Sequence, residues 1–217
     1  EDAVRTALEE QLVEGAQHCK DSEKNIFIYL TVSGEHKLAF ERLIDRVKEA
    51  FEERYEVKLN IHLSEQKPST DTIAVELDNN PFRNLDGSLL FRPGGHGALL
   101  ENLNEIDAEL IFIKNIDNVV PDRLKPHTVR YKKALAGLLL SYTGIIFDYI
   151  EKVYKSNDCD IELLLEILDF TKSELCVLPR NGLNIKDYKG LREYLLNILN
   201  RPIRVCGMVK NQGEPGG

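Results

Sequence analysis

Two short stretches of this chain carry residue types that could bind a phosphorylated ligand. The first is residues 94–97, Gly-Gly-His-Gly, in which glycines surround one histidine. Glycines allow positive φ angles and let a ligand approach backbone N–H groups closely. The second is residues 115–118, Asn-Ile-Asp-Asn, which follow an apolar run. A carboxylate just beyond a buried strand can hold a divalent cation, so the two stretches together indicate a nucleotide site.

Each stretch also has a plainer interpretation, which the residues alone leave open. Residues 94–97 could form a tight loop with an exposed histidine. They match neither the Walker A motif, since no Lys-Ser/Thr pair follows, nor the dinucleotide fingerprint, whose glycine spacing differs. Residues 115–118 could form an Asx-turn that stops a strand.

A third polar stretch, Ser-Glu-Gln-Lys-Pro-Ser-Thr-Asp at residues 64–71, follows an expected strand. Its Gln66 offers an amide donor and acceptor that suit a uracil edge, and Lys67 could neutralise a phosphate. The alternative is a solvated loop without a ligand.

The elements that must position these stretches alternate along the chain. Apolar residues three and four apart predict helices, and β-branched or alternating runs predict strands. We expect helices at 3–18, 35–51, 97–103, 122–154, 161–175 and 187–199, and strands at 25–32, 57–63, 72–75, 108–113 and 203–209. This order favours an α/β fold with a Rossmann-like, three-layer, mostly parallel sheet and helices on both faces. Ligands of such sheets bind beyond the carboxyl ends of the strands. We see no internal repeat.

Length, charge and apolar runs exclude several classes of protein. The 217 residues suggest one domain, and the net charge of -8 argues against nucleic-acid binding. The most apolar run, residues 134–147, is shorter than a membrane span of roughly 18 residues, so we expect a buried core helix. Nothing at the start resembles a secretory signal, and none of the four cysteines forms a C-x-x-C pair. We therefore expect a cytoplasmic protein with reduced cysteines in its core and no membrane partner.

Both ends of the chain have the appearance of cuts. It opens on a helical pattern without an initiator methionine and closes on Gly-Glu-Pro-Gly-Gly just after an expected strand. We expect a fold that is truncated at both ends.

The order of these stretches resembles the UDP-sugar pyrophosphorylase branch of the nucleotide-diphospho-sugar transferase superfamily. Residues 66–72 and 91–97 are more similar still to an uncharacterised bacterial family, domain of unknown function 4301, which we regard as a distant relative of those enzymes. The resemblance covers residues 25–122 and resumes at 205–217.

The resemblance implies that residues 1–217 are one nucleotidyltransferase-like α/β domain, a fragment of a longer chain, with a helical insertion at about 122–200. The implied ligand is a nucleotide or nucleotide-sugar. Gln66 and Gly95 would recognise the uracil and His96 the α-phosphate, while Asp117 would lie near Mg²⁺. The full implied set is Asp117 and Lys210 for catalysis, Asp117 for the metal, and Gln66, Gly94, Gly95, His96, Gly97, Asn115, Asn118, Gly216 and Gly217 for substrate.

Three departures from the pyrophosphorylase pattern bear on activity. The N-terminal Gly-rich loop with Arg and Lys, which cradles the triphosphate, is absent. Ala98 replaces an acidic residue, and the later catalytic lysine has only Lys210 as a candidate. We therefore expect these 217 residues not to turn over. Three hypotheses remain: a nucleotidyltransferase core, a catalytically silent nucleotide-binding domain, and a structural or interaction domain.

Overall fold

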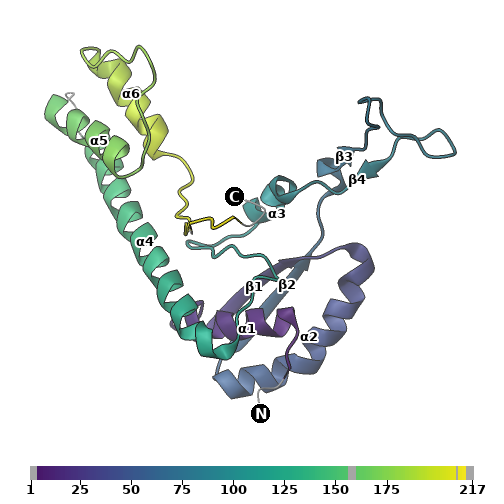
Figure 1. Cartoon of the computed structure of the whole chain (residues 1–217). Helices are drawn as coiled ribbons and strands as arrows, with labels where there is room; N and C mark the ends of the chain where they lie inside the picture. Colours follow the sequence, from purple (N-terminus) through teal and green to yellow (C-terminus); the bar gives the residue numbers. More distant parts are fainter. Residues whose placement is uncertain (1–3, 156–159, 209, 214–217) are drawn as a thin grey trace. The chain divides into compact units, whose positions relative to one another are not determined.

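The computed structural model describes residues 4–155, 160–208 and 210–213 (Figure 1). The chain divides into two compact units, Glu1–Val129 and Arg130–Gly217. Helices make up 51% of the structure. Within the described ranges, the strands form two sheets of two strands each. Each unit has its own hydrophobic core.

The first unit is built on a parallel β–α–β arrangement. Strands β1 (Asn25–Thr31) and β2 (Lys58–Ser64) pair in parallel, and α2 (Gly34–Tyr55) connects them (Figure 1). The register pairs Asn25 with Lys58 and Thr31 with Ser64. Both carboxyl ends therefore stand at the same edge of the sheet.

One face of this sheet is covered and the other is open. Helix α1 (Ala7–His18), which a capping box of Thr6 and Glu9 starts, packs with α2 on the buried side chains of Ile26 and Leu59. Because side chains alternate between the faces of a strand, Phe27 lies on the opposite face, where it is 54% exposed. The first unit therefore has two layers.

The predicted fold class is wrong. Residues 4–155, 160–208 and 210–213 contain one parallel pair of short strands, and no extended Rossmann-like sheet with helices on both faces. Residues 108–113 and 203–208 form no strand, and residue 209 lies outside the described residues. A continuous apolar run indicates burial but does not by itself specify strand pairing. The helices and the strands β1 and β2 are confirmed to within a few residues.

An antiparallel arm follows β2 in the sequence, after the short helix η1 (Pro68–Thr70). Strands β3 (Thr72–Ile73) and β4 (Phe91–Arg92) close its base. Above the base, three residues spaced by eight form a ring of backbone hydrogen bonds. Ala74 N donates to Leu90 O (2.9 Å), Leu90 N to Phe82 O (3.2 Å) and Phe82 N to Ala74 O (2.8 Å). This ring is a three-way junction.

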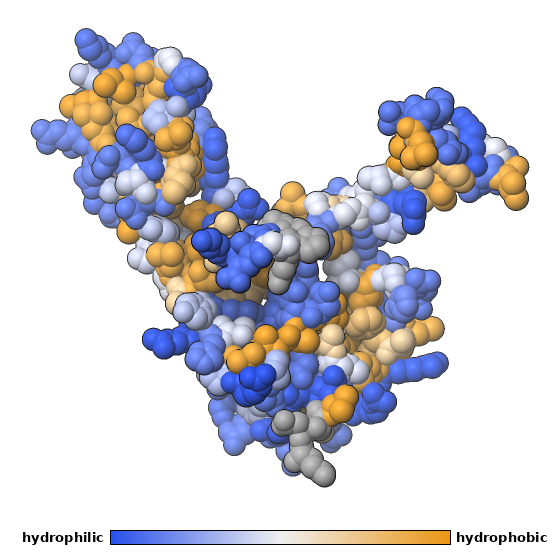
Figure 2. Space-filling model, in the orientation of Figure 1, coloured by the Kyte–Doolittle hydropathy of each residue, from blue (hydrophilic) through white to orange (hydrophobic). Residues whose placement is uncertain are grey.

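Two similar turns, residues 76–80 and 84–88, leave this junction. Each reads x-Leu-Asp followed by two small or polar residues, and in each the first N–H donates to the fifth carbonyl. The aspartates, Asp78 and Asp86, accept hydrogen bonds from the N–H two residues later. The turns thus repeat in sequence and in structure, which the sequence analysis did not find. Their leucines are fully exposed, and Figure 2 shows apolar surface at the end of the arm.

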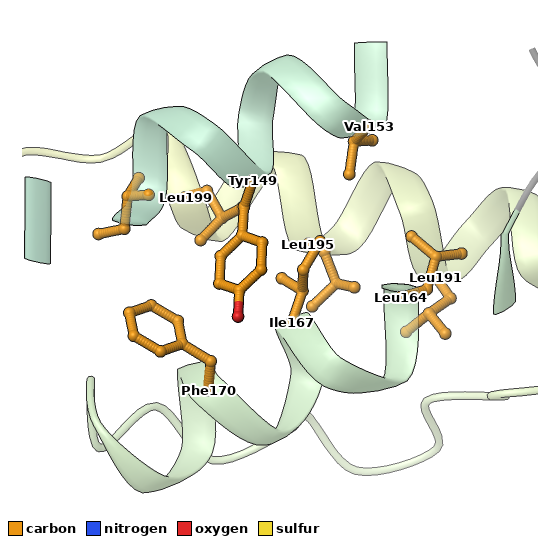
Figure 3. Packing of buried hydrophobic residues seen from close by; sticks show 9 residues of the cluster. Tyr149, Val153, Leu164, Ile167, Phe170, Leu191, Leu195 and Leu199 are labelled. Atoms are coloured by element: carbon orange, nitrogen blue, oxygen red, sulfur yellow. The ribbon is translucent and has the colours of Figure 1, made fainter. Parts of the chain in front are cut away.

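The second unit is a three-helix arrangement. The later part of α4 (Lys125–Lys155) packs with α5 (Ile161–Ser173) and α6 (Tyr188–Leu199). Figure 3 shows side chains from the three helices meeting in one core, with Leu191 and Leu195 fully buried. Asp160 and Asp187 cap α5 and α6 through backbone N–H groups. In this unit, the helix caps and the buried apolar faces therefore support the same three-helix structure.

Helix α4 differs from the prediction of a buried core helix at residues 134–147. Among the described residues, one helical stretch, Asp122–Lys155, is long and apolar enough to cross a membrane by length and composition, and only 11% of its most apolar window is buried. A core helix of a soluble protein can pass the same test. Figure 2 shows apolar surface over the helices of this unit. Cys176 and Cys206 are also exposed, so their predicted place in the core is wrong.

Candidate functional site

The Gly-rich turn lies directly against the loop that follows β2. A Cβ atom added to Gly94 would lie 2.9 Å from Ala98 Cβ, 3.0 Å from Thr70 O and 3.7 Å from Gln66 Nε2. Gly94 is therefore required for packing, because a side chain has no room there. This contact brings together two residues that the sequence placed in one site, Gln66 and Gly94.

Gly95 and Gly97 differ from Gly94 because nothing in the fold requires them to be glycine. A Cβ at either position would meet no atom within 4 Å, and Gly95 has an ordinary φ of −73°. Glycine nevertheless costs more conformational entropy on folding than alanine does. His96 lies exposed between them. The packing of the turn would therefore allow side chains at residues 95 and 97, yet both residues are glycine.

The segment after the turn is a short helix, as predicted. It begins as η2 (His96–Leu99) and continues as α3 (Leu100–Asn104). From α3, the Asn102 amide donates to Ser64 Oγ (3.2 Å) and to Glu65 O (2.9 Å). This clamp joins the helix to the carboxyl end of β2. The sequence analysis missed it, because a lone asparagine in a helix carries no distinguishing pattern.

Residues 115–118 form a turn that is held from α1. Asn118 N donates to Asn115 O (3.3 Å) and Val119 N donates to Asp117 O (2.9 Å). The Gln11 side-chain amide donates to the carbonyls of residues 115 and 116, at 3.3 and 2.9 Å. The turn is thus closed by backbone hydrogen bonds, and Asp117 is exposed.

A polar face of α1 also holds the chain segment that leads into this turn. Buried Glu14 pairs with Lys114 at 2.7 Å, and the Phe112 ring packs on His18 with centroids 4.8 Å apart. As the chain runs from residue 112 to 116, its partners run backwards along α1, from 18 to 11. The expected strand residues therefore lie extended along α1, where side-chain contacts replace strand pairing.

These contacts place the turn toward the carboxyl end of β1. The short connection of residues 19–24 makes α1 and β1 run in opposite directions. Gly15 lies beside Ile26 and Ile28, and Gln11 is about 6 Å further along the helix, since each residue rises 1.5 Å. Gln11 is thus level with the last residues of β1. The 115–118 turn and the Gln66–Gly94 contact both lie toward the edge where α/β folds bind ligands.

Ion pairs surround the Gln66 loop. Lys67 pairs with Glu101 at 4.0 Å and with Glu105, and the hydrogen bond to Glu105 is the main cause that raises the pKa of Lys67. Lys37 pairs with Glu65 at 3.1 Å. Exposed pairs of this kind are weak, because solvent screens the two charges. An arriving phosphate can therefore compete for both lysines.

A buried lysine anchors the start of α4 to the first unit. Lys125 is 2% exposed, and its ammonium contacts Glu10 (2.5 Å), Asp122 (3.1 Å) and Val120 O (2.6 Å). Burial lowers the pKa of Lys125, but its bonds to Glu10 and Asp122 raise that pKa further, so the net change is upward. The group is held charged and fully contacted. The Lys125 ammonium therefore stabilises the fold and is not accessible to a ligand.

The remaining predicted site residues belong to the second unit or lie outside the described residues. Lys210 is exposed and belongs to the second unit. Gly216 and Gly217 lie outside the described residues. No group of three His, Cys, Asp or Glu side chains that could hold a metal occurs within the described ranges. Asp117 therefore belongs to no such group of three.

The fold is thus helix-rich, with a parallel β–α–β unit that gathers polar loops at one edge. The model of one protein family, described as domain of unknown function (DUF4301), matches residues 1–217. The chain belongs to this family, which confirms that part of the resemblance. No curated protein and no solved structure matches the chain. The comparisons give no similarity to UDP-sugar pyrophosphorylases.

Proposed function

We propose that this domain binds a uridine-type nucleotide at the carboxyl edge of β1 and β2, as the core of a nucleotidyltransferase-like protein. One observation carries the proposal: Gly94 packs on the Gln66 loop, while Gly95 and Gly97 beside it leave space that the fold does not use. Open glycines next to an amide side chain suit a ligand that approaches the backbone closely. The choice of uridine as the nucleoside, and of nucleotidyl transfer as the reaction, rests on the motifs that resemble those of the UDP-sugar pyrophosphorylases.

In the proposed reaction, an oxygen of a sugar-1-phosphate attacks the α-phosphorus of the nucleoside triphosphate. The new P–O bond forms as the bond to pyrophosphate breaks, and pyrophosphate leaves. Such chemistry needs positioning and charge stabilisation more than covalent help from the protein. Gln66 and Gly95 would hold the base and His96 the α-phosphate, and Asn115 and Asn118 would orient the phosphate or sugar. A catalytic role for Lys210, which belongs to the second unit, rests on the resemblance alone.

Mg²⁺ fits this proposal as an ion that arrives with the nucleotide. Mg²⁺ usually binds one or two carboxylates, keeps several waters and takes its other ligands from phosphates. A single exposed carboxylate, Asp117, meets that requirement, whereas an all-protein cage would need a larger group of ligands. The ion would neutralise phosphate charge.

The second candidate is a nucleotide-binding domain without catalysis. It is favoured by the ion pairs around the Gln66 loop, because Lys37 and Lys67 are engaged by the carboxylates of the chain itself. A pyrophosphate-release assay with UTP and several sugar-1-phosphates separates the two candidates. We expect no release from these 217 residues, and robust turnover would overturn that expectation.

Substitution of Gly95 by alanine tests the site. Because the position has room and an ordinary φ, Gly95→Ala should leave the melting temperature unchanged or slightly raised. The new methyl group should instead weaken binding of UDP with Mg²⁺ at least tenfold, measured by calorimetry. Asp117→Asn should remove the part of the affinity that depends on Mg²⁺.

Two matched glycines serve as controls. Gly137→Ala, in α4 and equally unobstructed, should change neither binding nor folding adversely. Gly94→Ala should destabilise the first unit, because the added Cβ would meet Ala98 at 2.9 Å. If Gly95→Ala binds UDP as the wild type does, the open turn is no ligand site.

A further inference from the structure

Asn102 occupies the point where the helix after the Gly-rich turn touches the end of β2. Its side chain is 9% exposed, although it is polar and lies on a helix of five residues. Its amide nitrogen bonds to both Ser64 Oγ and Glu65 O. Ser64 Oγ lies 3.0 Å from Thr31 Oγ1 on β1. One amide therefore connects α3 to the ends of both strands.

The orientation of this amide is fixed by its partners. A carbonyl only accepts hydrogen bonds, so the atom that faces Glu65 O must be the Asn102 nitrogen. The Asn102 oxygen is consequently turned elsewhere, where it is buried and has no hydrogen-bond partner in the structure. A buried acceptor without a partner destabilises the folded state, because it loses its hydrogen bonds to water and gains none in return.

This cost shows that asparagine is a poor choice for stability alone. Leucine has the same branched shape as asparagine, although it is larger, and it would remove the unpartnered oxygen. It would also remove two hydrogen bonds, so the gain and the loss in stability nearly cancel. What only the amide supplies is a fixed connection between Glu65 and α3.

Building on the proposed function, we infer that Asn102 is the positioning residue of the nucleotide site. It acts through its neighbours. Gln66 directly follows the clamped Glu65, while Gly95 caps the short helix η2, and Gly97 lies within it, just before α3. The clamp therefore sets the spacing between the residue that would read the base and the turn that would meet the phosphate. Unsatisfied buried groups are retained where such a role offsets their cost.

Asn102→Leu separates positioning from stability. We expect its melting temperature to stay within about 3 °C of the wild type, because the two hydrogen-bond effects nearly cancel. We expect the Kd for UDP with Mg²⁺ to rise at least tenfold. Asn104→Leu, an exposed change on the same helix, is the matched control and should leave that Kd unchanged.

Asn102→Asp adds a readout that a merely structural residue would not move. An ionised carboxylate would repel Glu65 O, whereas a protonated one can donate to it and restore the clamp. Because burial raises a carboxyl pKa, UDP affinity relative to wild type at the same pH should recover as the pH falls from 8 to 5. This series also decides the matter if Asn102→Leu does not fold.

The outcomes distinguish this inference from the function on which it rests. If wild-type protein binds no UDP, the proposed function fails. If it binds UDP while Asn102→Leu binds equally well, or the relative affinity of Asn102→Asp is independent of pH, the positioning role is wrong and the nucleotide site stands.

Discussion

The Tyr149 hydroxyl group in the second unit carries a pH dependence of its own. It donates to Glu166 Oε1 at 2.8 Å, and burial, with this hydrogen bond, raises the pKa of Tyr149 to about 12. In the unfolded chain a tyrosine titrates near pH 10. Because the folded pKa is the higher one, the stabilisation is complete below pH 10 and is lost as the pH rises toward 12.

We therefore expect the free energy of unfolding of the second unit to fall by on the order of 2 kcal/mol between pH 10 and 12. Urea unfolding followed by circular dichroism at pH 9 and 11.5 measures this change. Tyr149→Phe should remove most of it, and Tyr131→Phe, at an exposed position, should not. A dependence that survives in Tyr149→Phe would contradict the assignment.

Single residues were predictable where their chemistry stands out in the sequence. Gln66 and Gly94 were singled out by type and position, and a Cβ added to Gly94 would lie 3.7 Å from Gln66 Nε2, so the two residues are neighbours. Asn102 and Gln11 were not, because each acts by donating to a backbone carbonyl distant in sequence. Glu14 is a third case: its partner, Lys114, lies 100 residues away, and no local pattern connects the two.

Helices could be predicted from the sequence where a capping residue precedes a regular spacing of apolar residues. Helices α1, α5 and α6 follow such periods, and side chains of Thr6, Asp160 and Asp187 cap them. The only signal at residues 108–113 was hydrophobicity. Hydrophobicity is equally compatible with a strand and with an extended segment that packs along a helix. The sequence feature that corresponds to this packing lies on α1. There Gln11, Glu14 and His18, which contact the segment, are spaced three and four residues apart.

At the scale of the whole molecule, the two cores share no residue. Leu12 is fully buried in the first core and Leu195 in the second. Scanning calorimetry should therefore resolve two transitions. Leu12→Ala should lower the free energy of unfolding of the first unit by about 2–5 kcal/mol, and Leu195→Ala should lower that of the second unit by a similar amount. Each substitution should therefore lower the temperature of one transition only. A single transition that both substitutions shift equally would show that the units unfold together.

The fold class could not be predicted because it depends on which segments pair over long distances. The alternation of helices and runs was interpreted as one continuous sheet. The chain instead forms one parallel pair, an arm and a separate helical unit, and local periodicity is the same in both arrangements. The family match covers the whole chain but specifies no chemistry.

The three-way junction in the arm makes one of its branches dispensable. Val75 pairs with Pro81 and Ile73 with Phe91, and the second register is offset from the first by one eight-residue period. Excision of residues 82–89 would bring Leu90 to the place of Phe82, so that a single uninterrupted hairpin closes on the same base. We expect the shortened protein to keep the wild-type NMR shifts of β1 and β2 and to bind UDP unchanged; loss of those shifts would show that the branch supports the sheet. Relatives that differ in length by eight residues here would then be a natural outcome of the geometry.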